Sequence, residues 1–575
     1  MGMLPPPSPP VDLPSWRRLP HMQKVHPLVL RWVEYGAETP LFVLGFYLIK
    51  AAAFVVGGLA LLAATPGLGG LGDLSNWWSE PIVYQKAIVF IWLFELLGLG
   101  GSSGPLTFKF LPPVIGFLHW LRPGTIRQPP WSKRVPLTRG DSRTVVDVVL
   151  MLATIAVMVS LLVVGGAGPV PQGATVGLLP HGLVIALVVL MVVLGLRDKV
   201  SVIAGRADLY LVPTIIFLFP YDQMMIGLKI ALVGIWVGAG VSKLTRHFAP
   251  VVTVMTSNAP FRPRWFKRLH FANFPEDVSP SRFAFGLAHM GTLVEIPLVL
   301  VMLFSTNTTL THVLVVIMVI FHLNIISFVP LAVPNEWNIF MIFAAIWLFW
   351  THAEVAVTDL GNPLLIAVLV LGLVVPVVLG NMRPDLVSFA FAMRYYAGNW
   401  PASLWCFRGD AAERISANVV KSAGLVSEQL TRIYDADYAE LMTYRMRAFR
   451  SMHIQGRALN GLLPRALDDV DAYEIIDGEL FAGPVNGWNM GDGHMHNWQL
   501  LESIQRRCHY APGELVLVHI ESQPIHRQQM RYHLIDAATG QFETGHIHMS
   551  DLADRQPWSD APLPVDVDPS NSGRN

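Results

Sequence analysis

A single lysine lies where an apolar run of the sequence ends in charged residues. The run "GIWVGAGVSKLTRH" covers residues 234–247 and reaches Lys243 shortly after Gly238 and Gly240. One interpretation is a lysine at a helix end whose amine reaches the lipid phosphates. The other is an amine held in a partly dry cavity, where desolvation lowers the pKa of a lysine until its neutral form acts as a base. The glycines favour close helix packing, which would surround the amine with protein.

Further polar side chains fall inside the apolar runs that follow. His289 and Glu295 belong to one run, and His322 and Asn324 belong to the next. Ionisable groups at membrane depth are costly, so each is a candidate for function. The six-residue separation of His289 and Glu295 puts them on roughly opposite sides of a helix, so we expect no direct pair. For His322, a hydrogen bond to a carbonyl is the alternative to acid–base chemistry.

Two His-x-His pairs lie late in the chain, formed by His494 with His496 and by His546 with His548. In a strand, residues two apart share a face, so each pair can give two ligands to one metal. Together with the carboxylates of Asp492 and Glu521, such a set would suit zinc or iron. The alternative is a polar, histidine-rich sheet surface without a metal.

The composition predicts that these residues are positioned by membrane helices. Of the 575 residues, 53% are hydrophobic and only 14% are charged, with a mean hydropathy of +0.46. A soluble protein has about 25% charged residues, and a membrane-spanning helix needs about 20 apolar residues. The apolar runs predict about ten transmembrane helices, over residues 41–64, 85–101, 145–166, 177–196, 207–220, 224–243, 284–305, 310–332, 337–352 and 362–382.

Lys and Arg gather in alternate loops between these runs. They are frequent before the first run and after the second, fourth and sixth, whereas the other loops, such as "STNTT", carry almost none. Positively charged loops stay in the cytoplasm. We therefore expect a multi-pass protein of the plasma membrane with both termini in the cytoplasm.

The composition also divides the chain into four parts. Residues 1–40 are Pro-rich and then basic, and we expect a cytoplasmic segment there. Residues 41–385 predict an all-α polytopic membrane domain. In residues 386–555, charged helical stretches precede strand-like pieces such as "GELVLVHIESQ", which predicts a smaller cytosolic α+β domain. Residues 556–575 are polar and Pro-rich and predict a disordered tail.

The segment "FRPRWFKRLHF" (261–271) mixes cations with aromatic residues. Stacking on nucleic acid is one interpretation, but the net charge of zero gives no general indication of a nucleic-acid partner. A membrane span ends just upstream, so we expect an interfacial segment instead. Its cations would lie on anionic headgroups, with Trp265, Phe266 and Phe271 at the boundary.

Three stretches between residues 200 and 352 resemble a known membrane domain. They are "AGVSKL" (239–244), "HMGTLVEIPLVLVMLF" around Glu295, and "FHLNIISF", which holds His322 and Asn324. In the same order, they are similar to the "AGVKKL" stretch, an acidic helix and the "FHxxN" helix of vitamin K-dependent γ-glutamyl carboxylase. The bacterial HTTM proteins share that domain, so the chain resembles an HTTM/γ-carboxylase-like family.

The resemblance implies that Lys243 is the base that deprotonates a reduced quinone. Two departures from the family weigh against carboxylation of protein glutamate. Ser242 replaces the other lysine of the family's pair, and the His-x-Asn spacing differs from "FHxxN". The charge pattern also puts Lys243 and a smaller terminal domain on the cytoplasmic side, opposite to the family. Proton abstraction from a lipid-soluble molecule agrees better with this sequence.

The leading hypothesis is therefore a membrane enzyme in which Lys243 abstracts a proton from a quinol-like substrate. Glu295, His289, His322 and Asn324 are the candidate supporting residues, and membrane lipids and the substrate are the expected partners. The alternative is a non-catalytic membrane scaffold or lipid transporter, which needs no titrating lysine. Convergence of Lys243, Glu295 and His322 would favour the enzyme, whereas an amine among the headgroups would exclude it.

Overall fold

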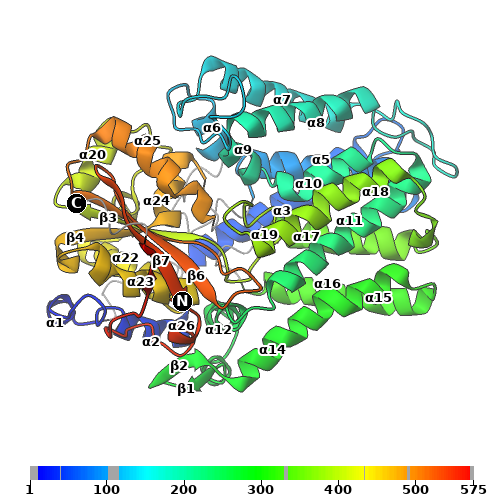
Figure 1. Ribbon diagram of the computed structural model, residues 1–575. Coiled ribbons are helices and arrows are strands. Elements are labelled where there is room, and N and C mark those ends of the chain that lie inside the picture. The colour runs from blue at the N-terminus through cyan, green and yellow to red at the C-terminus, as the bar shows by residue number, and fades with distance from the viewer. Residues whose placement is uncertain are drawn as a thin grey trace.

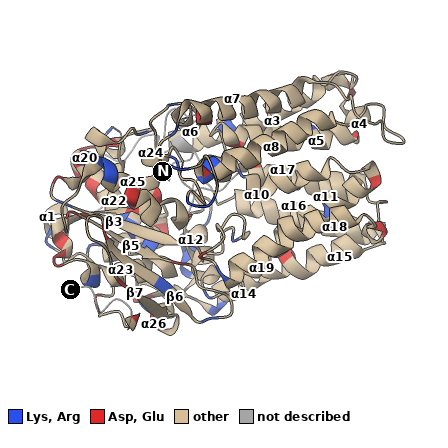
Figure 2. Cartoon of the chain, turned by 45° about the horizontal axis from the view of Figure 1, so that its top comes forward, with Lys and Arg blue, Asp and Glu red and all other residues tan. Residues whose placement is uncertain are grey.

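The computed structural model describes residues 11–38, 41–100, 115–328, 335–432, 434–488 and 492–569. A bundle of apolar helices lies against a sheet domain, which packs on one end of the bundle (Figure 1). Lys, Arg, Asp and Glu are concentrated in the sheet domain, whereas most residues of the bundle are uncharged (Figure 2). This division agrees with a membrane domain followed by an α+β domain.

The bundle is built from helices of very different length. Its first half comprises α3 (Leu41–Ala63), α5 (Pro81–Leu96), α7 (Val145–Val163), α8 (His181–Arg197), α9 (Lys199–Ala204), α10 (Ala207–Ile216) and α11 (Tyr221–Ser242). Its second half comprises α14 (Arg282–Leu293), α15 (Val299–Phe304), α16 (Thr308–Ile326), α17 (Asn335–Ala345), α18 (Pro363–Leu369) and α19 (Val375–Met382). Three π-helical segments continue or join these helices, namely η4 (Val294–Leu298), η5 (Ile346–Thr351) and η7 (Val370–Val374).

The prediction of about ten spanning helices is wrong. Among the described residues, six helical segments are long and apolar enough to cross a membrane, namely Leu44–Ala63, Val145–Val163, Tyr221–Ser242, Arg282–Phe304, Thr308–Ile326 and Pro363–Met382. The other four apolar runs also form helices, but α5, α8, α10 and α17 are shorter.

Too many spanning helices were predicted because a helix buried inside protein needs apolar residues just as a helix in lipid does. Every residue of α5 except Phe90 is buried, so its hydropathy reflects contact with neighbouring helices. Within the six long segments, 78% of the apolar window of α11 is buried, against 28–33% for the other five. Helix α11 is therefore central, and the other five expose apolar faces that suit lipid.

The sheet domain contains a six-stranded antiparallel sheet in the order β4-β3-β5-β6-β7-β8. The strands are β3 (Ala402–Arg408), β4 (Tyr473–Asp477), β5 (Leu515–Ile520), β6 (Gln529–Asp536), β7 (Gly540–His548) and β8 (Asp566–Val567). The accompanying helices are α20 (Ala411–Asn418), α21 (Val426–Leu430), α22 (Ala436–Ser451), α23 (Ile454–Ala466), α24 (Gly478–Asn486), α25 (Trp498–Cys508) and α26 (Ser550–Ala553).

Alternate residues of the central strand β5 enter two separate cores. Leu515 and Leu517 join one apolar cluster, and Val516 and Val518 join the other. Successive side chains of a strand point to opposite faces, so both faces of the sheet are covered. This explains the continuous apolar run of β5, which is buried along its whole length.

The described residues near both ends of the chain pack on the sheet domain. Helices α1 (Leu13–Arg17) and α2 (His26–Tyr35) contribute Trp16 and Trp32 to a core of the sheet domain. At the other end β8 pairs with β7 and Leu563 is buried in the second core, so the described part of the predicted tail, residues 556–569, packs on the sheet domain. Residues 570–575 lie outside the described part.

Short elements complete the connections. They are η1 (Leu71–Asp73), α4 (Leu74–Trp77), α6 (Ile115–Trp120), α12 (Phe248–Asn258), α13 (Arg264–Arg268), β1 (Phe271–Asn273), β2 (Asp277–Pro280), η6 (Val357–Asp359), η8 (Val470–Ala472) and η9 (Gly493–Met495). Strands β1 and β2 form a separate two-stranded sheet next to the start of α14 (Figure 1).

Candidate functional site: a buried lysine–glutamate pair

Lys243 and Glu295 form a buried ion pair at the end of the central helix α11. The Lys243 Nζ atom lies 2.5 Å from Oε1 of Glu295, and the two residues are 6% and 3% exposed. Lys243 is the C-cap residue of α11, so the amine sits at the helix end that faces the sheet domain. It is covered by protein and does not extend into the surroundings, as a headgroup anchor would.

Glycines of α11 allow this close approach. A Cβ atom on Gly240 would lie 2.6 Å from Cγ1 of Ile296 and 3.0 Å from Cβ of Glu295. A Cβ atom on Gly238 would lie 2.7 Å from Sδ of Met393. The distances of 2.6 and 2.7 Å are too short for a real Cβ atom, so glycine at 240 lets α11 approach η4 and glycine at 238 lets it approach Met393. The close packing expected from these glycines is present.

Glu295 projects from the π-helical segment η4, which also contains Pro297. Proline lacks the N–H that an α-helix would use, so it favours a wider turn at this point. Single π-turns inside α-helices are common at functional sites. Only one oxygen of Glu295 is engaged by Lys243. The second oxygen, Oε2, is buried and has no hydrogen-bond partner within the described ranges.

His322 lies near the pair, but both of its ring nitrogens are occupied. Helix α16, which carries His322, packs on η4. Trp236 Nε1 donates to His322 Nε2 at 3.0 Å, and His322 Nδ1 lies 2.9 Å from Asn338 Oδ1. Because an indole only donates, Nε2 must be unprotonated and Nδ1 must carry the proton. His322 is therefore neutral, and its ring is held in one orientation.

Asn324 and His289 do not join this group. Both side chains are exposed, and Asn324 Oδ1 accepts a hydrogen bond of 2.9 Å from Arg262. Of the candidate residues, Lys243 and Glu295 are therefore paired and His322 lies on α16, which packs on η4, whereas Asn324 and His289 are exposed.

A second buried polar group lies in the first half of the bundle and was missed at the sequence level. Its charged members, each at most 6% exposed, are Lys50, Glu95, Arg206, Asp208 and Glu336. Arg206 forms a two-bond fork with Asp208 at 3.2 and 3.1 Å. Its guanidinium also lies over the adjacent rings of Trp337 and Tyr395, at 4.9 and 5.0 Å from their centroids.

These charges connect helices that are far apart in sequence. Lys50 of α3 lies 3.8 Å from Glu336 of α17, and Tyr395 donates a hydrogen bond to Asp208 of α10. The signal that could have found Glu95 was a carboxylate within an apolar run, the same signal that singled out Glu295.

The four histidines of the two His-x-His pairs separate into different environments. His494 Nε2 lies 3.0 Å from Glu521 Oε2, and His496 Nδ1 lies 2.6 Å from the Ser403 hydroxyl. These two histidines occupy the η9 turn and the residue after it, not a strand, so the shared-face argument does not apply to them. His546 and His548 do lie on β7 as expected, next to Asp568 and Asp566. Within the described ranges, no three His, Cys, Asp or Glu side chains are placed to hold a metal.

In the His494–Glu521 pair, each side chain favours the charged form of the other. Burial opposes the charge of Glu521, but the adjacent His494 lowers the pKa of this carboxyl to about 2. Burial likewise disfavours the charged imidazole, yet Glu521 and Asp492 together raise the pKa of His494. Lys199 of α9 donates a hydrogen bond of 2.9 Å to the His494 carbonyl oxygen, so this pair lies where the bundle meets the sheet domain.

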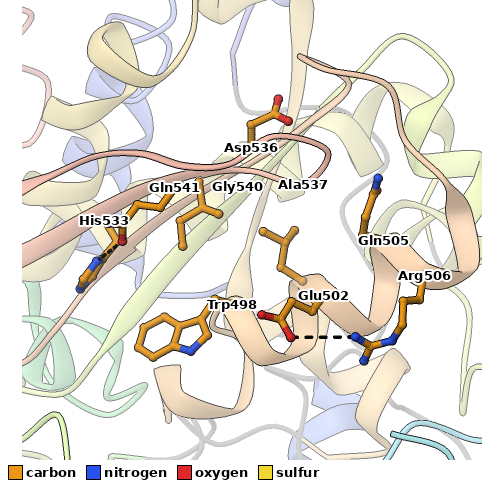
Figure 3. A pocket seen from close by; sticks show the side chains of 11 residues that line it. Trp498, Glu502, Gln505, Arg506, His533, Asp536, Ala537, Gly540 and Gln541 are labelled. Atoms are coloured by element: carbon orange, nitrogen blue, oxygen red, sulfur yellow. Dashed lines mark hydrogen bonds and ion pairs between the residues drawn. The ribbon is translucent and has the colours of Figure 1, made fainter. Parts of the chain in front are cut away.

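A pocket opens between α25 and the hairpin of β6 and β7 (Figure 3). Its volume is about 500 Å³, and its wall includes Trp498, Glu502, Arg506, His533 and Gln541. His533 Nδ1 donates to Gln541 Oε1 at 2.8 Å, and Arg506 lies 3.9 Å from Glu502. The pocket belongs wholly to the sheet domain and is separate from the Lys243–Glu295 pair.

The helical bundle with its spanning segments and the attached sheet domain define a multi-pass membrane protein with a C-terminal α+β part. The chain belongs to the family described as "Transmembrane protein of unknown function (DUF3556)", whose model matches residues 1–568. The match takes in the bundle and the sheet domain alike, and it gives no support to membership of the HTTM or carboxylase families. No curated protein and no solved structure matches the chain.

Proposed function

We propose that the protein is a membrane enzyme that removes a proton from a lipid-soluble, quinol-like substrate at the Lys243–Glu295 pair. The observation that carries the proposal is the geometry of the pair: a buried carboxylate with one oxygen held by an amine and the other unpartnered. A buried group of this kind in a membrane protein is a functional candidate by default.

In this proposal the two side chains have different parts. Lys243 already holds Oε1, so Glu295 Oε2 is the atom that accepts the proton. The substrate O–H bond breaks, its proton moves to Oε2, and its electron pair stays on the substrate oxygen. Glu295 becomes neutral, and the ammonium group of Lys243 then stabilises the substrate anion. This reverses the simplest sequence interpretation, in which the lysine itself is the base.

His322 supports this arrangement as a positioning residue. Its ring is held by Trp236 on one side and Asn338 on the other, so it keeps a fixed orientation next to the pair. A fixed wall costs no reorganisation when charge develops on the substrate.

The same proposal includes an orientation. The sheet domain, α1 and α2 lie together at the end of the bundle where Lys243 is found, and the Lys- and Arg-rich loops favour the cytoplasm for that side. We place this end on the cytoplasmic face of the plasma membrane.

The test compares three variants in lipid nanodiscs. Each is incubated with quinols and with a membrane lipid extract, and loss of substrate is followed by mass spectrometry. The wild type is expected to turn over the substrate. Glu295→Gln and Lys243→Met are expected to show no turnover. Lys229→Met is the matched control, because Lys229 is a buried lysine of the same helix whose amine donates to the carbonyls of His352 and Val355 at 2.8 and 2.7 Å. Wild-type turnover by Glu295→Gln would refute the proposal.

A further inference from the structure

Large apolar side chains project from the segment 261–269, where α12 passes into α13. Phe261 is 86% exposed, Trp265 is 69% exposed and Leu269 is 46% exposed. Trp265 and Leu269 are four residues apart, so they share one side of the chain there. Exposed aromatic residues next to a membrane bundle are typical of the lipid–water interface.

Cations alternate with these apolar side chains. Arg262, Arg264, Lys267 and Arg268 all lie within the segment, and only Arg268 forms an ion pair among the described residues, with Glu34. Arg264 lies over the Tyr35 ring at 4.3 Å from its centroid. The segment therefore carries an excess of positive charge.

Lys267 is the cation of this segment that most clearly has no carboxylate partner among the described residues. It is only 4% exposed, and no carboxylate in the described ranges lies within ion-pair distance of it. Burial and the charge of Arg264 lower the pKa of Lys267 to about 8. A lysine in such surroundings is stabilised by an external anion.

The segment lies at the level where membrane helices begin and end. Helix α14 starts at Arg282, shortly after it, and α12 packs on both α13 and α14. Arg262 donates a hydrogen bond to Asn324, two residues before the last residue of α16. Contact with these helix ends puts the segment at a membrane surface once α14 and α16 span the bilayer.

We propose that residues 261–269 form a docking surface for an anionic phospholipid leaflet, with Phe261 and Trp265 inserted among the lipids, Arg262 and Arg264 paired with headgroup phosphates, and the buried charge of Lys267 adding to the attraction from behind them. The charge complementarity and the continuity with α14 and α16 carry this assignment. Of the three aromatic residues expected at the boundary, only Trp265 is exposed. Phe271 is buried in β1, and Phe266 packs against His270 and Phe283.

The test uses an environment-sensitive fluorophore on a single introduced cysteine. Cys406 and Cys508 are both buried, so the native background is low. Phe261→Cys reports on the docking surface, and Val420→Cys is the control, because Val420 is 39% exposed in the sheet domain. Both labelled proteins are placed in nanodiscs of phosphatidylcholine alone and of phosphatidylcholine with phosphatidylglycerol.

A blue shift at position 261 in the phosphatidylglycerol discs is expected, larger than in phosphatidylcholine alone and absent at position 420. Replacing Arg262, Arg264 and Lys267 by Gln should remove the difference between the two lipids. Equal spectra at position 261 in both lipids would overturn the assignment to an anionic leaflet, whether or not the triple variant folds. A shift that requires added RNA and not lipid would overturn it in favour of nucleic acid.

Discussion

At the scale of single residues, Lys243 and Glu295 depend on each other. Neither charge has another ion-pair partner in the described part of the chain, and an unpaired buried charge costs far more than a buried pair. The sequence pointed to both residues, because ionisable groups in apolar runs stand out. It could not show which would pair, since Lys243 and Glu295 come from different helices and their contact depends on Gly240.

Removing one partner should therefore destabilise the protein more than removing both. Lys243→Met is expected to lower the free energy of unfolding by about 3 kcal/mol, because Glu295 is left buried and unpaired. The double variant Lys243→Met/Glu295→Leu should recover most of that loss. Thermal unfolding in detergent measures both, and a double variant less stable than Lys243→Met would contradict the pairing.

The pair of His494 and Glu521 should make stability depend on pH in two directions. Glu521 titrates near 4.5 when unfolded and near 2 when folded, so its contribution is lost as pH falls from about 4.5 to 2. The pKa of His494 is raised above 6.5, so its contribution is complete below that pH and is lost as pH rises through the raised value. Stability from this pair is greatest between these limits.

Glu521→Gln isolates that contribution. The difference in unfolding free energy between wild type and variant should be largest near pH 5 to 6 and shrink toward both acid and alkali. Tryptophan fluorescence during urea unfolding at several pH values measures the difference. A difference that stays constant with pH would exclude a charged pair.

At the scale of elements, helix existence was predictable and helix role was not. All ten apolar runs contain helices, because their hydrophobicity and length leave no other stable form. The division into spanning and buried helices depends on which neighbours cover each one, as α5 and α11 show. The π-turn at Glu295 could not be predicted from the sequence either. Pro297 is compatible with several backbone conformations, and packing selects among them.

Contact between α11 and η4 should fail when a methyl group is added at Gly240. The new Cβ would meet Ile296 and Glu295 at 2.6 and 3.0 Å, so Gly240→Ala is expected to cost about 1–3 kcal/mol. Gly286→Ala in α14 is the control, because nothing lies within 4 Å of the Cβ built there. The measurement is the melting temperature of the Gly240→Ala variant compared with that of the Gly286→Ala variant. Equal values would show that α11 can shift to make room for the methyl group.

At the scale of the whole molecule, polar contacts join the bundle to the sheet domain. Asp141, just before α7, accepts hydrogen bonds from Arg507 and Arg506 of α25 at 2.6 and 2.8 Å. Burial opposes this charge, but the two arginines lower the pKa of Asp141 to about 2. Such long-range partners leave no local pattern, and so the sequence predicted two domains without indicating how they join.

Asp141→Asn should loosen this junction without unfolding either part. Backbone amides of α25 are expected to exchange hydrogen faster, because the helix loses its charged anchor on the bundle. Asp385→Asn serves as a control, since its partner Arg383 is two residues away and the pair, at 2.9 Å, is local. Mass spectrometry of exchange in nanodiscs provides the readout, and unchanged exchange in α25 would show that other contacts suffice.

The placement of α1 and α2 imposes an order on biosynthesis. Trp16 and Trp32 belong to the same core as residues of α22 and β5, and Arg17 pairs with Asp437 and Glu440. The ribosome adds Arg17 to the chain 420 residues before its partner Asp437. Helix α2 also packs on α12 and α13, which are made midway, but the contacts of α1 and α2 with the core of the sheet domain form only after every membrane helix has been synthesised.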